Sequence, residues 1–159
     1  MKPGRFTIEQ LSEGQFEIFE DGTIHRQPVS QSPSELHRSL TRKHSARIGI
    51  DPIFVSDGKY NVLLDTGLGW GLDAGSSYKD VSNVKTNLDI FGRTPEDITH
   101  VILTHLHYDH AAGSTFTDHS ASTVATFPNA RYYVQRREWE YALSQLENDR
   151  PVKGARYQL

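Results

Sequence analysis

Residues 101–113 read Val-Ile-Leu-Thr-His-Leu-His-Tyr-Asp-His-Ala-Ala-Gly, and this stretch decides how the rest of the sequence is interpreted. Its first part, with His100 in front, is a short apolar run rich in β-branched residues, which is typical of a buried central strand. A cluster of histidine and aspartate begins where that run ends. Functional side chains often lie on loops at strand ends, where a rigid sheet fixes them. The stretch therefore predicts a central strand over residues 100–104, followed by a functional loop.

The loop carries four side chains of the kinds that bind metal ions: His105, His107, Asp109 and His110. His105 and His107 are two residues apart, so in extended backbone their imidazoles emerge on one side and can converge on one ion. Four such groups within six residues exceed what one tetrahedral ion usually takes from a single loop, which favours two ions. Imidazole and carboxylate suit zinc, with iron, manganese and cobalt as alternatives. The structural alternative is that these histidines are exposed or hydrogen-bonded and hold no metal.

The remaining histidines show no such spacing and are left out of the metal set. Three lie in polar segments, one begins the strand and one lies beyond the loop: His25, His37, His44, His100 and His119. The chain has no cysteine, so neither a disulfide nor a thiolate metal site can form. Any metal must therefore be held by His, Asp or Glu.

Length, composition and charge describe one soluble globular unit. The chain has 159 residues, of which 36% are hydrophobic and 23% charged, as in ordinary globular domains. The net charge of -3 offers no basic field, which argues against nucleic acid and anionic membranes as partners and suits a small neutral or acyl substrate. No apolar run approaches the roughly 20 residues that span a bilayer, and the first residues lack an apolar signal core. We expect a cytoplasmic protein.

The pattern before the loop predicts mostly strands. Residues 6–19 read as two short strands that form a hairpin around a Ser-Glu-Gly turn. Residues 23–43 are polar and contain two prolines, which indicates an exposed loop or cover segment with a helical turn near residues 34–40. Two apolar runs at 47–55 and 60–64 are joined by an Asp-Gly turn, and we expect adjacent antiparallel strands.

The pattern around and after the loop predicts helices that alternate with strands. Apolar residues recur at helical spacing over 81–92, and a proline marks the start of a short helix at 94–97. A further strand is expected at 131–134 and a helix at 137–146. The tail, residues 147–159, shows no clear pattern.

Three further residues lie in or near the loop, and two of them, Asp65 and Tyr108, have both a structural and a functional interpretation. Asp65 lies at a strand end, where its carboxylate can accept the second N–H of a ligand histidine and fix its tautomer. As an alternative, Asp65 is simply a turn residue that bonds its own backbone. Tyr108 either lines a pocket or packs inside. Gly113 fits a backbone requirement, because it lets the ligand loop turn.

Three segments resemble the metallo-β-lactamase superfamily: residues 63–67 (Leu-Leu-Asp-Thr-Gly), residues 94–98 (Thr-Pro-Glu-Asp-Ile) and residues 101–113. Within that superfamily, the histidine segment is most similar to the N-acyl homoserine lactonase-like branch. The resemblance extends over about residues 46–142. It implies an α/β fold, the αββα sandwich in which two similar αβ halves pack sheet to sheet. Residues 1–159 account for the N-terminal αβ half of such a domain.

The resemblance also implies a ligand assignment. His105 and His107 would bind the first ion, Asp109 and His110 the second, and Asp65 would be the supporting carboxylate. The Asp-His pair argues against true zinc β-lactamase activity. The family's remaining ligands, a further histidine, a bridging aspartate and a last histidine, normally lie downstream and have no counterpart in this sequence. We therefore expect a complementary C-terminal half, in the same chain or another, with a homodimer as one arrangement.

These expectations together describe a metal-dependent hydrolase with two divalent ions. A hydroxide shared by the two ions would open a lactone or cleave a related ester, and Asp109 would act as the catalytic residue that moves the proton to the leaving group. Alternatives on the same scaffold are a thioesterase or a phosphodiesterase. A diiron redox protein and a non-catalytic, incomplete metal-binding subunit are alternatives from other classes.

Overall fold

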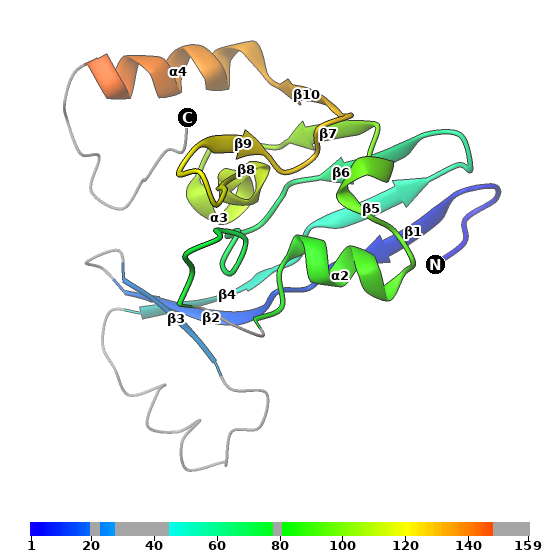
Figure 1. The fold of residues 1–159 in the computed structure, drawn as a ribbon, viewed down its shortest axis with the longest axis horizontal. Helices are drawn as coiled ribbons and strands as arrows, with labels where there is room; N and C mark the ends of the chain where they lie inside the picture. The colour runs from blue at the N-terminus through cyan, green and yellow to red at the C-terminus, as the bar shows by residue number, and fades with distance from the viewer. Residues whose placement is uncertain (20–22, 28–44, 78–80, 148–159) are drawn as a thin grey trace.

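The computed structural model describes residues 1–19, 23–27, 45–77 and 81–147. Its largest element is a five-stranded sheet, seen across the centre of Figure 1. The strands follow one another in the order β1 (Thr7–Gln10), β5 (Ile53–Ser56), β6 (Asn61–Leu64), β7 (His100–Leu103) and β10 (Arg131–Val134). β1, β5 and β6 pair antiparallel, whereas β6, β7 and β10 pair parallel. The predicted hairpin of β5 and β6 and the predicted strand 131–134 are confirmed.

One face of this sheet is covered by helix α2 (Val84–Ile90), which lies across it in Figure 1. Asn83 begins the helix with a capping box, and Gly92 follows its end with a φ of 65°. The predicted helix over 81–92 is confirmed with narrower bounds. The covered face and the helix form the main core, together with residues from the loops and α4: Leu11, Phe54, Leu63, Val84, Leu88, Ile98, Val101, Leu103, Leu106, Ala111, Phe127 and Ala142.

A second, three-stranded sheet has the order β3 (Ile24–Arg26), β2 (Gly14–Phe19) and β4 (Ser45–Ile50), all antiparallel. The predicted hairpin within residues 6–19 is wrong, because β1 and β2 belong to different sheets. The strand predicted over 47–55 is divided in the same way between β4 and β5.

The chain crosses between the two sheets twice, and the two crossings run side by side. The amide of Leu11 donates to the carbonyl of Pro52 at 2.7 Å, and the amide of Glu13 donates to the carbonyl of Ile50 at 2.8 Å. Pro52 has no N–H to donate to a sheet, which accounts for the break between β4 and β5. The local apolar pattern does not register this break, since residues on both sides of it are β-branched.

β3 corrects the expectation of a loop across residues 23–43, since part of that segment is a strand. The helical turn expected at 34–40 lies outside the described residues, as does the tail from 148 onward. The remaining elements include the predicted helices near 94 and 137 and four short elements that the sequence did not predict. They are η1 (Pro95–Asp97), α3 (Tyr108–Ala111), η2 (Ala112–Ser114), β8 (Thr115–Thr117), β9 (Thr123–Ala125) and α4 (Arg136–Glu147).

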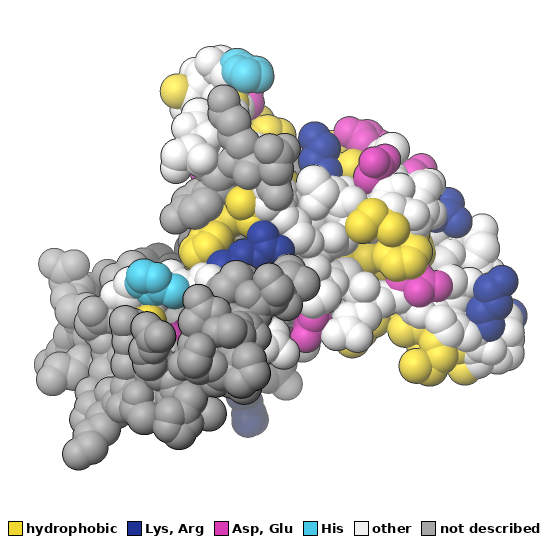
Figure 2. Space-filling model, turned by 90° about the horizontal axis from the view of Figure 1, so that it is seen from below, with side chains coloured by type: hydrophobic (Ala, Val, Ile, Leu, Met, Phe, Trp, Pro, Cys, Tyr) yellow, Lys and Arg dark blue, Asp and Glu magenta, His cyan; other side chains and the backbone are white. Residues whose placement is uncertain are grey.

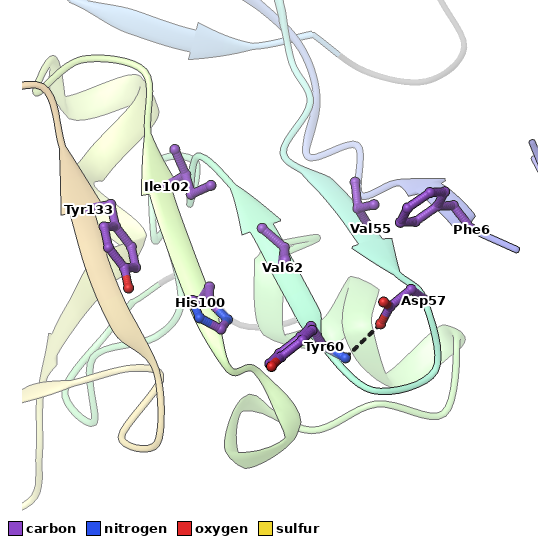
Figure 3. A pocket seen from close by; sticks show the side chains of 8 residues that line it. All are labelled: Phe6, Val55, Asp57, Tyr60, Val62, His100, Ile102 and Tyr133. Atoms are coloured by element: carbon purple, nitrogen blue, oxygen red, sulfur yellow. Dashed lines mark hydrogen bonds between the residues drawn. The ribbon is translucent and has the colours of Figure 1, made fainter.

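The face of the large sheet opposite α2 is open. β7 lies in the middle of the parallel part, as predicted, but only one of its faces is buried: Val101 and Leu103 point into the core, whereas Ile102 is 41% exposed. Figure 3 shows the side chains of this open face in a row across the strands, around a hollow of about 440 Å³. They are Phe6, Val55, Asp57, Tyr60, Val62, His100, Ile102 and Tyr133.

On another face, seen in Figure 2, hydrophobic side chains form separate patches, and acidic and basic side chains are interspersed between them. No helix in the described part of the chain has the length and apolar character needed to cross a bilayer.

Candidate metal centre

The ends of two parallel strands bring the predicted site residues together. β6 and β7 pair in parallel with Leu64 opposite Ile102, so the residues that follow each strand emerge at the same edge of the sheet. The amide of Asp65 donates to the carbonyl of Ile102 at 3.0 Å, which continues the pairing one residue further. Asp65 therefore lies beside the start of the histidine loop, although it is 40 positions before His105 in the sequence.

The loop folds so that three histidine rings lie close together. His107 caps the short helix α3, and the amide of His110 donates to its carbonyl at 2.9 Å. The ring centroids of His105 and His107 are 4.6 Å apart, and those of His105 and His110 are 4.0 Å apart. Asp109 lies next to this group, with its Oδ2 3.6 Å from the Nε2 of His110.

Asp65 contacts both the loop and one of the rings. Its Oδ2 lies 2.8 Å from the Nδ1 of His110, which leaves Nε2 of that ring directed toward Asp109. Its Oδ1 accepts from the amide of Thr104 at 2.7 Å and from the Thr104 hydroxyl at 3.0 Å. A carboxylate on Nδ1 of a histidine favours the tautomer that presents Nε2 to a metal, which is the geometry that the supporting role of Asp65 requires.

The turn after Asp65 supports the helix that carries His110. The amide of Thr66 donates to the carbonyl of His110 at 2.7 Å, and the amide of Gly113 donates to the carbonyl of Gly67 at 3.1 Å. A Cβ atom at Gly113 would overlap the carbonyl oxygen of Thr66. The backbone requirement expected at Gly113 is thus a close approach between two segments.

Local contacts shift the pKa values of three groups in the cluster. The hydrogen bond to Asp65 raises the pKa of His110, despite its partial burial. Burial, and then the neighbouring His110 and His107, lower the pKa of His105. Burial alone would raise the pKa of Asp65, but the hydrogen bonds from His110 and Thr104 outweigh it and lower that pKa.

The cluster meets part of what a divalent cation requires. Imidazole and carboxylate are suitable donors, and two histidines in contact can supply two of the four ligands that zinc takes. Within the described residues, no group of three or more His, Asp or Glu side chains is arranged to hold a metal ion by itself. The four predicted ligands are therefore adjacent, and a complete coordination sphere needs further donors or a rearrangement of these.

Three residues that contact this region were not singled out from the sequence. The hydroxyl of Thr104 lies between Asp65 and the Nδ1 of His105, at 3.1 Å from the latter. The Oε1 of Glu138, in the first turn of α4, accepts from the amide of Leu106 at 2.9 Å. The position of Thr104 at a strand end was a usable signal, whereas nothing in the local sequence connects Glu138 to a loop 32 residues before it.

The third such residue is Glu13, which is 1% exposed. Its Oε2 accepts from the amide of Leu68 at 3.0 Å, and its Oε1 from the amide of Val84, the first residue of α2, at 3.2 Å. Burial raises the pKa of Glu13 to about 7, although both amides and the charge of Arg26 act in the opposite direction. Glu13 thereby connects the crossing between β1 and β2 to the turn after Asp65 and to the start of α2.

The structure also places Tyr108, which had two interpretations, and two of the histidines outside the predicted metal set. Tyr108 packs against the small core of the three-stranded sheet and also borders a hollow between the loop after Asp65 and the β8–β9 hairpin. His25 contacts Phe19, and His100 lies between Tyr60 and Tyr133 on the open face. His37 and His44 lie outside the described residues.

A sequence model of the metallo-beta-lactamase superfamily matches residues 49–151, which include the cluster and the turn that supports it. The chain belongs to the metallo-β-lactamase superfamily. The resemblance that the three sequence motifs indicated is confirmed, as is the α/β fold of that superfamily. The N-acyl homoserine lactonase AttM of Azorhizobium caulinodans is 40% identical over 53 residues, which are 33% of this chain and 16% of that protein.

Solved structures show the same superfamily fold. A probable metal-dependent hydrolase from Staphylococcus aureus is 27% identical, with a TM-score of 0.62, and the match covers 91% of this chain and 52% of that one. AidC, described as a dizinc quorum-quenching lactonase, is 22% identical with a TM-score of 0.60, covering 90% of this chain and 46% of its own. This member of the superfamily therefore spans about half the length of the solved structures that it matches.

Proposed function

We propose that this chain forms part of a metal-dependent hydrolase that opens lactones or cleaves related esters. The observation that carries the proposal is the contact between the rings of His105, His107 and His110 at the ends of β6 and β7, with Asp65 bonded to the Nδ1 of His110. The likeness to AttM and to AidC, both named as lactonases, supports the substrate class.

In this proposal His105 and His107 hold one divalent ion, and Asp109 and His110 hold a second. Zinc is the ion of choice, because the donors are imidazole and carboxylate and because AidC is described as a dizinc enzyme. Such ions, when bound, supply a nucleophile from water at neutral pH and polarise the carbonyl under attack. Asp65 keeps the Nδ1 of His110 engaged, so that its Nε2 is the atom available to a ligand.

Asp109 is the candidate for proton movement. Its carboxylate lies at the edge of the histidine cluster, 3.6 Å from the Nε2 of His110, and its side chain is 17% exposed. A carboxylate that is bound near the reacting water and can reach solvent is suited to take a proton and return it to the leaving alkoxide. Its neighbour Asp65 is engaged by Thr104 and His110 and is not free for that role.

The test uses His107→Ala and Asp109→Asn in the protein purified with its complementary half. Both variants should lose bound zinc and most lactone hydrolysis, by at least about 100-fold. Elemental analysis and an assay panel of lactone, thioester and phosphodiester substrates measure the two effects. His119→Ala, which changes a histidine outside the cluster, serves as the control. Full lactone turnover by metal-free His107→Ala protein would end the proposal.

We also propose that residues 1–159 form the N-terminal αβ half of the domain and that a second αβ layer covers the open face of the large sheet. Two observations support this: the apolar row from Phe6 to Tyr133 on that face, and the extent of the solved relatives, about twice that of this chain. The second layer would also supply the missing ligands. Native mass spectrometry tests the proposal, and a chain that stays monomeric and binds two zinc ions alone would contradict it.

One observation favours a second candidate function. No group of three ligands in the described residues is arranged to hold an ion alone, which suits a non-catalytic subunit that keeps the loop but binds metal weakly. Elemental analysis of the purified protein separates the two functions, since a metal content below one ion per chain with no turnover favours this second candidate.

A further inference from the structure

The backbone of the histidine loop is held by carboxylates on two sides. The amide of Thr104, just before His105, donates to Oδ1 of Asp65 at 2.7 Å. The amide of Leu106, just before His107, donates to Oε1 of Glu138 at 2.9 Å. Each of the two histidines is thus preceded by an amide that is bonded to a distant carboxylate, from the turn after β6 on one side and from α4 on the other.

The contact between the Leu106 amide and Glu138 matters because Leu106 is buried. Leu106 is 4% exposed and packs in the main core, and its two sequence neighbours are histidines whose ring centroids lie 4.6 Å apart. A buried amide without an acceptor is destabilising, so this segment of backbone needs a partner. β7 ends at Leu103, and no strand pairing among the described residues includes Leu106. The Glu138 carboxylate supplies that acceptor, and a charged acceptor gives a bond roughly twice as strong as a neutral one.

Glu138 is also well anchored. It lies in the first turn of α4, which directly follows the parallel strand β10. The same helix places Ala142 in the main core, the cluster to which Leu106 also belongs. A carboxylate attached to a packed helix can hold an amide in one place, whereas one on a mobile loop cannot.

We propose that Glu138 is a positioning residue for the metal centre, which fixes the backbone between His105 and His107 and so directs their imidazoles toward a common ion. This inference rests on the proposed function, since it assumes that these two histidines are ligands. It makes α4 part of the site, although α4 supplies no ligand.

The first experiment measures metal affinity by titration with Co²⁺, followed by visible absorption, in the protein purified with its complementary half. Glu138→Ala should weaken Co²⁺ binding by about 10- to 100-fold and change the absorption band, as is usual for the loss of a residue that orients a ligand. Glu138→Gln keeps an oxygen acceptor and should lose clearly less. Glu140→Ala removes the same charge from an exposed position of the same helix and should bind Co²⁺ like the wild type.

The second experiment measures hydrogen exchange at the Leu106 amide in metal-free protein. Exchange should be faster in Glu138→Ala than in the wild type and in Glu140→Ala, while amides in β7 keep their protection. If the wild type binds no Co²⁺, the proposed function fails. In that case the exchange result still reports on the contact between Glu138 and Leu106.

Equal Co²⁺ affinity and equal Leu106 exchange in the wild type and Glu138→Ala would overturn the inference. If Glu138→Ala does not fold, Glu138→Gln provides the test. This variant should fold, bind Co²⁺ somewhat more weakly than the wild type and exchange its Leu106 amide somewhat faster. An unchanged spectrum and affinity in folded Glu138→Gln, together with unchanged Leu106 exchange, would likewise overturn it.

Discussion

Asp65 occupies an unusual backbone conformation, with a φ of 59°, and this conformation explains how one residue can serve both sides of the site. Aspartate and asparagine enter the left-handed region more readily than other residues that carry a Cβ. The sharp turn directs the carboxylate back toward Thr104 and His110, while the next residue, Thr66, reaches the carbonyl of His110. The backbone geometry and the support of the ring therefore depend on the same side chain.

Gly113 provides a residue-scale prediction. Gly113→Ala should destabilise the fold by about 1–3 kcal/mol, because the added methyl group meets the carbonyl of Thr66 and forces the turn away from α3. Urea unfolding measures the change. The matched control is Gly75→Ala, whose added methyl group would meet nothing within 4 Å. The control should stay within about 0.5 kcal/mol of the wild type. Equal stability of the two variants would contradict the close approach.

At this scale the sequence predicted that the four side chains lie close together, and it predicted the contacts that support them only in part. His105, His107, Asp109 and His110 are neighbours in sequence, so their proximity follows from the loop itself. Asp65 was recognisable because it follows a strand. Glu138 was not, because its role depends on where α4 packs, and packing between distant segments leaves no local pattern.

At the scale of elements, Glu13 connects three segments through one buried carboxyl group, and this gives a pH dependence. Burial raises its pKa in the folded protein from 4.5 to about 7, so the folded state binds the proton more tightly than the unfolded chain. Its contribution to stability is fully present below about pH 4.5 and is lost as the pH rises through about 7. The difference corresponds to a contribution on the order of 3 kcal/mol.

Glu13→Gln should therefore flatten the decrease in the free energy of unfolding between pH 5 and pH 8. Urea unfolding at several pH values measures the slope, with the exposed Glu96→Gln variant as the control. The raised pKa of His110 also lowers the free energy of unfolding as the pH rises, and this contribution is the same in both variants. Identical slopes in Glu13→Gln and the wild type would contradict the raised pKa of Glu13.

The elements themselves were largely predictable, whereas most of their pairing, apart from the hairpin of β5 and β6, was not. Apolar periodicity located α2 and α4, and the turn between β5 and β6 was recognised from its Asp-Gly pair. β1 and β2 were expected to pair because they are adjacent in sequence, but each pairs with a more distant strand. The break at Pro52 and the three-residue strands β8 and β9 are too short for periodicity to detect.

At the scale of the whole molecule, the open sheet face predicts where substitutions are tolerated. Ile102→Asp should change the stability of the isolated chain by less than about 1 kcal/mol, because this side chain is 41% exposed. In the assembled protein it should weaken association with the complementary layer by at least about tenfold. Native mass spectrometry measures the association, and Ile90→Asp, at a site 75% exposed on α2, is the control. Unchanged assembly of Ile102→Asp would place the partner elsewhere.

The doubled crossing between the sheets determines how the molecule can deform. A single connecting segment would let one sheet rotate against the other. Here two backbone segments run together and are joined by the hydrogen bonds from Leu11 to Pro52 and from Glu13 to Ile50. Twisting one sheet against the other would shear both bonds at once. The Glu13 side chain also accepts a hydrogen bond from the amide of Leu68, in the turn after Asp65. We therefore expect the small sheet and this turn to move together, as one rigid unit, in slow torsional motions.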